Sequence, residues 1–257
     1  EITYGDWSSD VCSSDLSVAP HPALRQGLFA QGQLDLSRAE AVVLPRAAVR
    51  AGATGPFVQA LRGARIEHLI IDGNKSANIS LNGCRGAGIF LYRGFGTVIE
   101  HCTVRNYFGD GISFQQSNDV QVEGCVVERC AGFGLHPGSG SQRPSVKNCR
   151  AIANGEDGFF FCWRVRGGVA EGNWLENNGG YGMSIGHKDS DNFVRRNTII
   201  GNKLGGVYWR GETEPMAAHR ITFENNTVRD NEGWGLFVDG ATHGTIIRSG
   251  RVGKPSA

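Results

Sequence analysis

The chain has 257 residues, a formal net charge of +1 at pH 7, and charged residues at 20% of its composition. This balance gives no electrostatic reason to expect a nucleic-acid partner. No stretch reaches the roughly eighteen consecutive apolar residues that a membrane-spanning helix needs, so we expect no membrane span. The 38 glycines indicate many tight turns.

The first 62 residues lack the pattern that governs the remainder, and they divide into two parts. Residues 1–16 read EITYGDWSSDVCSSDL and resemble the translated sequencing adapter that recurs at the ends of metagenomic reading frames. Residues 17–62 contain LRQGLFAQG, VLPRAAVR and PFVQ in this order, and resemble the late β-barrel part of periplasmic adaptor proteins of efflux pumps. We therefore expect a chimeric sequence with a foreign, irregular N-terminal segment. The alternative is an ordinary cap of a repeat protein, since such caps are atypical in sequence.

From residue 63 onward, a glycine followed by a short apolar segment recurs every 23 or 24 residues, and once more after a longer interval. These glycines are Gly88, Gly111, Gly134, Gly158, Gly182, Gly206 and Gly235. The segments after them are three to five residues long and rich in β-branched and aromatic residues, which favours strands over helices. A fixed period of this length predicts a solenoid of about seven coils.

Two columns of polar residues share the same period. The first is Cys102, Cys125, Cys149, Asn173, Asn197 and Asn226; the second is Asn106, Cys130, Asn154, Asn178, Asn202 and Asn231. Inward asparagines that stack on successive coils can bond to one another and satisfy their buried amides. We expect the second column to adopt the left-handed backbone conformation at a turn. The cysteines are expected to be buried stacked thiols, although the spacing of neighbouring coils would also allow a disulfide.

Residues 63–257 thus resemble the right-handed parallel β-helix repeat proteins of the pectin-lyase-like superfamily. The resemblance implies an all-β fold, a right-handed parallel β-helix, and a polysaccharide substrate or ligand held along a lateral groove. It also implies an extracellular or periplasmic location, although this chain shows no signal peptide. The oligomeric state stays open.

Alternation along each strand decides which side chains face outward. Positions one and three after the repeat glycine should point inward, and positions two and four outward. The outward columns are Ser113, His136, Phe160, Ser184 and Tyr208, and then Gln115, Gly138, Cys162, Gly186 and Arg210. Aromatic faces beside polar groups suit a saccharide. We therefore predict substrate contacts from Phe160, Trp163, Tyr208, Arg143 and Gln115.

Residues 135–144 depart most from the repeat, because glycine, serine and proline take the place of strand residues. We expect a loop there that presents His136 and Arg143 to the groove. Asp110 and Asp157 each precede a repeat glycine, and we interpret them as turn residues.

The candidate catalytic residues follow the strands of the middle coils. They are His187, Arg164, Asp189, Asp191, Glu212, His136, Lys188 and Arg210. In β-elimination of a uronate, Arg164 or Arg210 would offset the carboxylate, or a Ca²⁺ held by Asp189 and Asp191 would do so. His187, His136 or Lys188 would take the C5 proton, and Tyr208 would donate one. In hydrolysis, Asp189 or Asp191 would act with Glu212.

No catalytic motif of a characterised family matches this chain position for position, so no residue role is transferred to it. The favoured hypothesis is a polysaccharide-acting enzyme of lyase or hydrolase type with no certain cofactor. The alternative is a non-catalytic glycan-binding or structural module outside the cell. The two differ in whether an acid and a base converge at one place.

Overall fold

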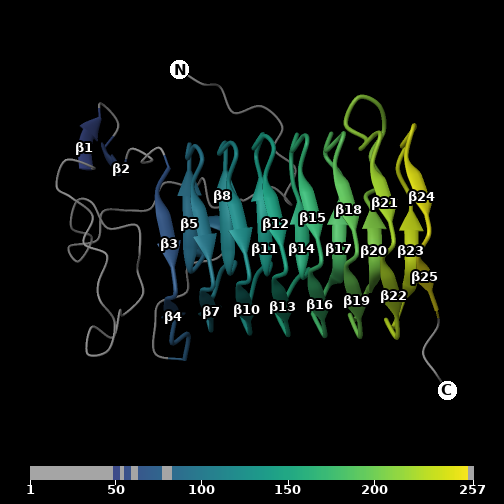
Figure 1. Cartoon of the computed structure of the whole chain (residues 1–257), viewed down its shortest axis with the longest axis horizontal. Helices are drawn as coiled ribbons and strands as arrows, with labels where there is room; N and C mark the ends of the chain where they lie inside the picture. The colour runs from purple at the N-terminus through teal and green to yellow at the C-terminus, as the bar shows by residue number, and fades with distance from the viewer. Residues whose placement is uncertain (1–48, 53–54, 59–62, 77–82, 254–257) are drawn as a thin grey trace.

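The computed structural model describes residues 49–52, 55–58, 63–76 and 83–253. Three parallel β-sheets run side by side along this part of the chain, and successive coils follow one another from the N-terminal to the C-terminal end (Figure 1). The strands confirm the predicted all-β solenoid of about seven coils. The predictions for residues 1–16 and 17–62 lie outside the described residues, apart from an antiparallel pair of strands, β1 (Val49–Gly52) and β2 (Gly55–Val58).

Each coil contributes one strand to each sheet. Sheet 1 contains β3 (Arg65–Glu67), β6 (Val98–Glu100), β9 (Gln121–Glu123), β12 (Ser145–Lys147), β15 (Val169–Glu171), β18 (Phe193–Arg195), β21 (Thr222–Glu224) and β24 (Ile246–Arg248). Sheet 2 contains β4 (Ile70–Asp72), β7 (Thr103–Arg105), β10 (Val126–Glu128), β13 (Arg150–Ile152), β16 (Trp174–Glu176), β19 (Thr198–Ile200), β22 (Thr227–Arg229) and β25 (Arg251–Val252). Sheet 3 contains β5 (Ile89–Tyr92), β8 (Ile112–Gln115), β11 (Leu135–Gly138), β14 (Phe159–Phe161), β17 (Tyr181–Ile185), β20 (Gly205–Trp209) and β23 (Trp234–Val238). A single 3₁₀ turn in the described residues, Cys84–Gly86, precedes β5.

The core lies between the three sheets and consists of the inward positions of each strand. The predicted inward residues of sheet 3 are all buried: Ile112, Phe114, Leu135, Phe159, Phe161, Met183, Ile185, Val207 and Trp209. The repeat glycines of this sheet sit where a side chain would collide with the next turn. A Cβ on Gly111 would lie 1.9 Å from a methyl group of Val127, and one on Gly158 would lie 2.6 Å from the amide of Asn178.

Two asparagine ladders run along the coils at the ends of sheet 2. In one, the Asn154 side-chain amide donates to Asn178 at 3.1 Å, Asn178 to Asn202 at 2.9 Å, and Asn202 to Asn231 at 2.9 Å. In the other, Asn173 donates to Asn197 at 3.0 Å and Asn197 to Asn226 at 2.9 Å. Both ladders continue into the cysteine columns, because the backbone N–H groups of Cys130 and Cys149 donate to the next asparagine.

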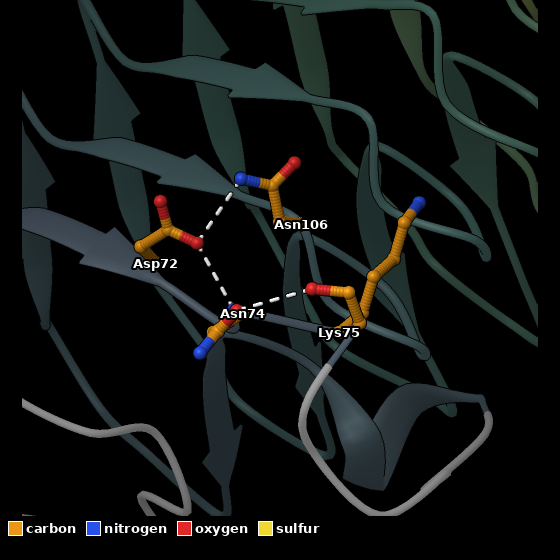
Figure 2. A pocket seen from close by; sticks show the side chains of 5 residues that line it. Asp72, Asn74, Lys75 and Asn106 are labelled. Atoms are coloured by element: carbon orange, nitrogen blue, oxygen red, sulfur yellow. Dashed lines mark hydrogen bonds between the residues drawn. The ribbon is translucent and has the colours of Figure 1, made fainter.

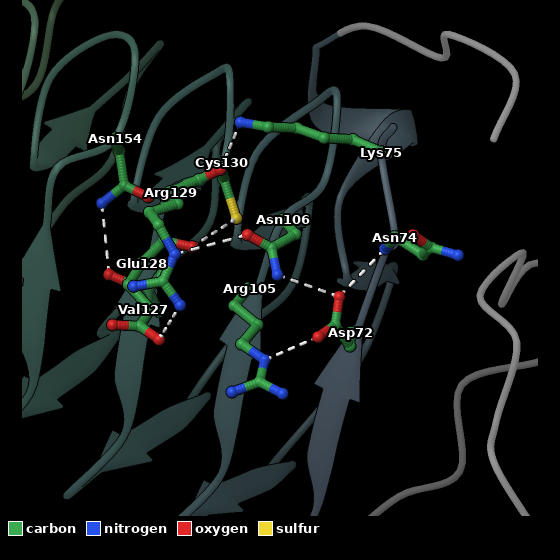
Figure 3. Close-up of polar contacts among 10 residues, drawn as sticks. All are labelled: Asp72, Asn74, Lys75, Arg105, Asn106, Val127, Glu128, Arg129, Cys130 and Asn154. Atoms are coloured by element: carbon green, nitrogen blue, oxygen red, sulfur yellow. Dashed lines mark hydrogen bonds and ion pairs between the residues drawn. The ribbon is translucent and has the colours of Figure 1, made fainter. Parts of the chain in front are cut away.

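Asn106 does not belong to the ladder, so this part of the prediction was wrong. Thr103 pairs with Val126, which aligns Asn106 with Arg129 and aligns Tyr107 with Cys130. The left-handed conformation also falls one residue before the ladder, at Arg129, Ala153, Asn177, Gly201 and Asp230. Asn106 instead donates to Asp72 at 3.0 Å. Figure 3 shows this end of the ladder, from Asn154 to Asp72.

Asp72 also accepts a 3.0 Å bond from the backbone N–H of Asn74. The two contacts form one wall of a small polar pocket at the first coil, which Figure 2 shows from close by. The remaining lining residues are Lys75 and Ser76.

The six cysteines within the described residues are all buried and free, and they include the four predicted to be buried thiols: Cys102, Cys125, Cys130 and Cys149. Burial raises the pKa of the Cys130 thiol to about 11. No helix in the described part of the chain is long and apolar enough to cross a membrane.

Residues 135–138 form strand β11 rather than the predicted loop. Leu135, His136, Pro137 and Gly138 pair with the four residues of β8. Pro137 has no N–H to donate, and the pairing with β14 is accordingly interrupted: Leu135 pairs with Phe159, and Gly138 forms an isolated bridge to Cys162.

Candidate functional site

The outward face of sheet 3 carries the predicted column of side chains. The strand register places Ser113 beside His136, Phe160 beside Ser184, and Ser184 beside Tyr208. Phe159 and Phe161 belong to the core cluster whereas the buried Phe160 between them does not, as the predicted alternation requires, but the predicted exposure of the column is not found. His136 and Phe160 are 2% and 1% exposed, and Ser113 and Ser184 are fully buried. Side chains of neighbouring coils pack over this column.

His136 is held by a buried carboxylate from the preceding coil. Its Nδ1 lies 2.7 Å from Oδ2 of Asp110, and both side chains are buried. An ionised carboxylate there favours the tautomer with the proton on Nδ1, which makes Nε2 the basic nitrogen. The other oxygen of Asp110 accepts a 3.0 Å bond from the backbone N–H of Phe133.

Asp157 repeats this arrangement two coils further on. Its Oδ1 accepts a 2.7 Å bond from the backbone N–H of Tyr181, and its Oδ2 accepts a bond from the Ser184 hydroxyl. The guanidinium of Arg210 lies 3.9 Å from Oδ2. Burial raises the pKa of the Asp157 carboxyl, while the Ser184 bond and Arg210 act in the opposite direction. Each of the two aspartates thus joins successive coils with one oxygen and faces the outward column with the other.

Phe160 is the centre around which the charged groups gather. The His136 ring stacks on Phe160 with centroids 5.1 Å apart, and the guanidinium carbon of Arg210 lies 4.4 Å from the centroid of Phe160. Phe133 packs against both rings. This cation–π contact and ring stack place a guanidinium and an imidazole against the same aromatic side chain.

Glu156 lies within the electrostatic reach of this group. Partial burial, together with the negative charges of Asp110 and Asp157, raises the pKa of Glu156 to about 7, and His136 and Arg210 oppose the shift. Glu156 is exposed to solvent, so its carboxyl group is accessible. A carboxyl group with this pKa is partly protonated at neutral pH and can donate or accept a proton.

A second imidazole lies at the end of sheet 3. The His187 Nε2 lies 2.9 Å from Glu212, and its ring stacks on Trp163 at 5.2 Å. Trp163, Arg164, His187 and Lys188 all have left-handed backbone conformations. The equivalent turn position is also left-handed at Arg93, Gln116 and Ser139 of earlier coils, so this conformation recurs with the repeat. Arg164 is exposed at this turn, and Lys188 is half-buried.

Several predicted site residues have structural partners instead. Asp189 is fully buried, and its oxygens accept bonds from the backbone N–H groups of Val165 at 2.8 Å and Gly186 at 3.2 Å. Two coils earlier, the Ser141 hydroxyl occupies the equivalent position and accepts a 3.0 Å bond from the backbone N–H of Ser117. Burial raises the pKa of Asp189 well above its usual value.

Asp191 and Arg143 each form an exposed bidentate ion pair between successive coils. Asp191 accepts bonds from Arg220 at 2.6 and 2.8 Å, and Arg143 donates to Asp119 at 2.7 and 2.8 Å. These contacts leave Asp189 and Asp191 without the arrangement expected of a Ca²⁺ site or of a hydrolytic pair with Glu212. We therefore omit Asp189, Asp191 and Arg143 from the site proposed below.

The two remaining predicted contact residues lie at opposite ends of the outward face. Gln115 is buried and donates to the Ser113 hydroxyl at 3.2 Å. Tyr208 is half-buried between Tyr181 and Phe237, at ring distances of 4.8 and 5.2 Å, and its hydroxyl donates to Asp239 at 3.2 Å.

Sequence reasoning missed Asp110, Glu156 and Asp157 as members of the site. The sequence analysis interpreted Asp110 and Asp157 as turn residues because each precedes a glycine. A turn role accounts for the oxygen that accepts a backbone N–H bond, but not for the second oxygen, which contacts His136 or Ser184. The available signal was their position: both precede the repeat glycine of sheet 3, so both carboxylates lie at the start of the strands that carry the outward column.

Comparison with known proteins agrees with this architecture. The family model described as "Right handed beta helix region" matches residues 62–219, and the chain belongs to this family. Two mannuronan C5-epimerases of Azotobacter vinelandii, AlgE2 and AlgE3, are 28% and 29% identical over 114 residues, or 44% of this chain. Those residues span only 11% and 6% of the two relatives. The crystal structure of the periplasmic alginate epimerase AlgG superposes with a TM-score of 0.59 at 15% identity, covering 75% of this chain and 47% of that one.

Proposed function

We propose that this protein acts on a uronate-containing polysaccharide by removing the proton at C5 of a uronate unit. The observation that carries the proposal is the convergence of Asp110, His136, Asp157 and Arg210 from several coils around the Phe160 ring, with Glu156 within electrostatic reach of the group. The similarity to mannuronan C5-epimerases supports it, since those proteins are named for chemistry at the same carbon.

The chemistry explains why these residue types belong together. The C5–H bond lies next to the uronate carboxylate, so removal of the proton moves its electron pair into the carboxylate and adds negative charge there. A cation must offset that charge. Arg210 is the half-buried cation of the cluster. His136, oriented through Nδ1 by Asp110, supplies the base at Nε2.

The fate of the intermediate decides the reaction type. Return of a proton to the opposite face of C5 gives epimerisation. Loss of the oxygen linked at C4 forms a C4–C5 double bond and breaks the chain, which is elimination. Glu156, which is accessible and partly protonated at neutral pH, supplies the proton in the first case and protonates the leaving oxygen in the second.

Access to His136 requires a rearrangement, because this side chain is 2% exposed. Arg210 packs over Phe160 and is itself partly exposed. A uronate carboxylate that binds Arg210 would draw the guanidinium away from the ring and open the way to His136. Exposed Arg164 and half-buried Trp163 lie along the same face and would contact neighbouring sugar units.

A non-catalytic glycan-binding module is the second candidate, and the burial of His136 and Phe160 favours it. In that case the cluster would stabilise the fold beneath a binding surface. For either function, the proposed location is the periplasm or the outside of the cell, because AlgG, which shares this fold, is a periplasmic epimerase.

The test is incubation of the full chain with polymannuronate, polyguluronate and polygalacturonate. Proton NMR would follow the ratio of C5 epimers, and ultraviolet absorbance would follow unsaturated uronate. We expect one of the two signals with one polymer, and its loss in His136→Gln and Arg210→Ala. Binding of a polymer with neither signal would support the non-catalytic module instead.

A further inference from the structure

The loop between β20 and β21 carries a second cluster of ionisable side chains, which shares no residue with the Phe160 site. Glu214 and His219 lie on this loop, and His243 lies in the turn of the next coil. The His219 and His243 rings stack with centroids 3.8 Å apart. Their ligating atoms and a carboxylate oxygen of Glu214 all lie within 4.8 Å of one another.

The distances within the cluster resemble the edges of a metal coordination sphere. One Glu214 oxygen lies 3.2 Å from Nε2 of His219 and 3.7 Å from Nε2 of His243. Bonds of about 2.1 Å in a tetrahedral site separate neighbouring ligand atoms by roughly 3.4 Å. The two measured edges lie on either side of this value.

The three ligands differ in exposure, and this difference bears on how they could converge. His219 is 8% exposed and closely packed, whereas the side chains of Glu214 and His243 are 56% and 61% exposed. The stacked rings must splay for both Nε2 atoms to converge, and the exposed His243 ring has the room to turn. The Nδ1 of His219 accepts a long 3.3 Å contact from the backbone N–H of His243, which must open so that Nδ1 can carry the proton. One long neutral hydrogen bond is weak beside a bond between zinc and imidazole.

We infer that Glu214, His219 and His243 bind a zinc-class divalent cation through two imidazoles and one carboxylate. This donor set suits zinc, and it does not suit calcium or magnesium, which prefer oxygen ligands. The inference does not depend on the proposed function.

A bound ion would also affect the structure of the solenoid. Two ligands come from the loop and the third from the following coil, so the metal would join the loop to the end of the solenoid. The same loop supplies Glu212 to His187, at 2.9 Å. A bound ion would therefore restrict the loop that borders the proposed polysaccharide site.

The test is isothermal titration of the full chain with Zn²⁺, in a Cys12→Ser background so that the cysteine outside the described residues contributes no thiolate. We expect one ion per chain and a rise in the thermal unfolding midpoint with Zn²⁺ but not with Ca²⁺. His243→Ala should weaken binding at least about tenfold. His101→Ala is the matched control, because His101 stacks on His68 elsewhere in the solenoid, and it should leave Zn²⁺ binding unchanged.

X-ray absorption at the zinc edge supplies the independent measurement. A first shell of nitrogen and oxygen alone is expected. Absence of Zn²⁺ binding, equal binding by His243→Ala and the wild type, or a sulfur ligand at the metal would each overturn the inference.

Discussion

The asparagine ladders and the outward face of sheet 3 are built on the same repeat, yet they use it in opposite ways. In the ladders, each coil places the same side chain in the same environment, and Asn154, Asn178 and Asn202 make equivalent bonds. On the outward face, successive coils carry serine, histidine, phenylalanine, serine and tyrosine at one register position. Repetition therefore identifies what holds the solenoid together, and departure from repetition identifies where a specific chemistry can be assembled.

The largest expected effect comes from breaking a ladder. Asn178→Ala removes an acceptor for two groups of Asn154 and a donor to Ala151 and Asn202, all of them buried. Buried polar groups without partners cost about 1–3 kcal/mol each, so we expect a loss of about 3 kcal/mol or more of unfolding free energy. Urea unfolding followed by circular dichroism measures it.

The neighbouring residue provides the control for this variant. Asn177 is exposed with a φ of 53°, and Gly201 occupies the equivalent position of the next coil. Asn177→Gly should change stability by less than about 1 kcal/mol. Similar losses in the two variants would contradict the structural role assigned to the ladder.

The next effect concerns the outward face. Asp110→Asn keeps an oxygen for the backbone N–H of Phe133 but no longer holds His136 in the same tautomer. We expect C5 chemistry to fall by about 100-fold or more, with the circular dichroism spectrum retained. Asp119→Asn, in the exposed pair with Arg143, is the control and should keep its activity. Unchanged activity in Asp110→Asn would contradict the proposal that Asp110 orients His136 as the base.

A smaller effect is expected from the titration of Glu156. Its pKa rises from 4.5 to about 7 on folding, so its contribution to stability is fully present below pH 4.5 and is lost as the pH rises through 7. Glu156→Gln should remove this dependence and gain stability relative to the wild type between pH 5 and 8. The gain should stay below about 1 kcal/mol because solvent screens this exposed group. Parallel pH profiles of the two proteins in urea unfolding would show that the pKa is not raised.

The smallest effect is expected at the exposed ion pairs. Arg220 holds the pKa of Asp191 below its usual range through a bidentate contact. Because both side chains are exposed, Arg220→Ala should cost less than about 1 kcal/mol, and the difference should shrink in high salt. A larger or salt-independent loss in thermal unfolding would show that this pair does more than join two turns.

The period of the sequence predicted the coils, the inward core and the ladders, because each of these depends on one position that recurs. Two details escaped it. Asn106 is one residue out of register with Cys130, and residues 135–138 pair as a strand although their composition suggests a loop. In both cases the backbone pairing of neighbouring coils outweighs local preference.

The candidate site was predictable only in part. His136, Phe160 and Arg210 followed from strand alternation, but their burial did not, since it depends on how side chains of different sizes pack on neighbouring coils. The sequence suggested that Asp189 belongs to a charged surface segment. In the structure its buried carboxylate accepts a backbone N–H bond between coils, as the Ser141 hydroxyl does two coils earlier. Glu156 was missed because its raised pKa depends on burial and on the proximity of Asp110 from an earlier coil, neither of which the sequence shows.

Solvent exchange at C5 is the decisive experiment for the proposed chemistry. The full chain and its His136→Gln variant would be incubated with a uronate polysaccharide in D₂O, and deuterium at C5 would be measured by NMR and mass spectrometry. We predict deuterium at C5 in the wild type or, where elimination follows at once, unsaturated products, and neither with the variant. A wild-type protein that binds the polymer but leaves every C5 proton in place would contradict the proposed function.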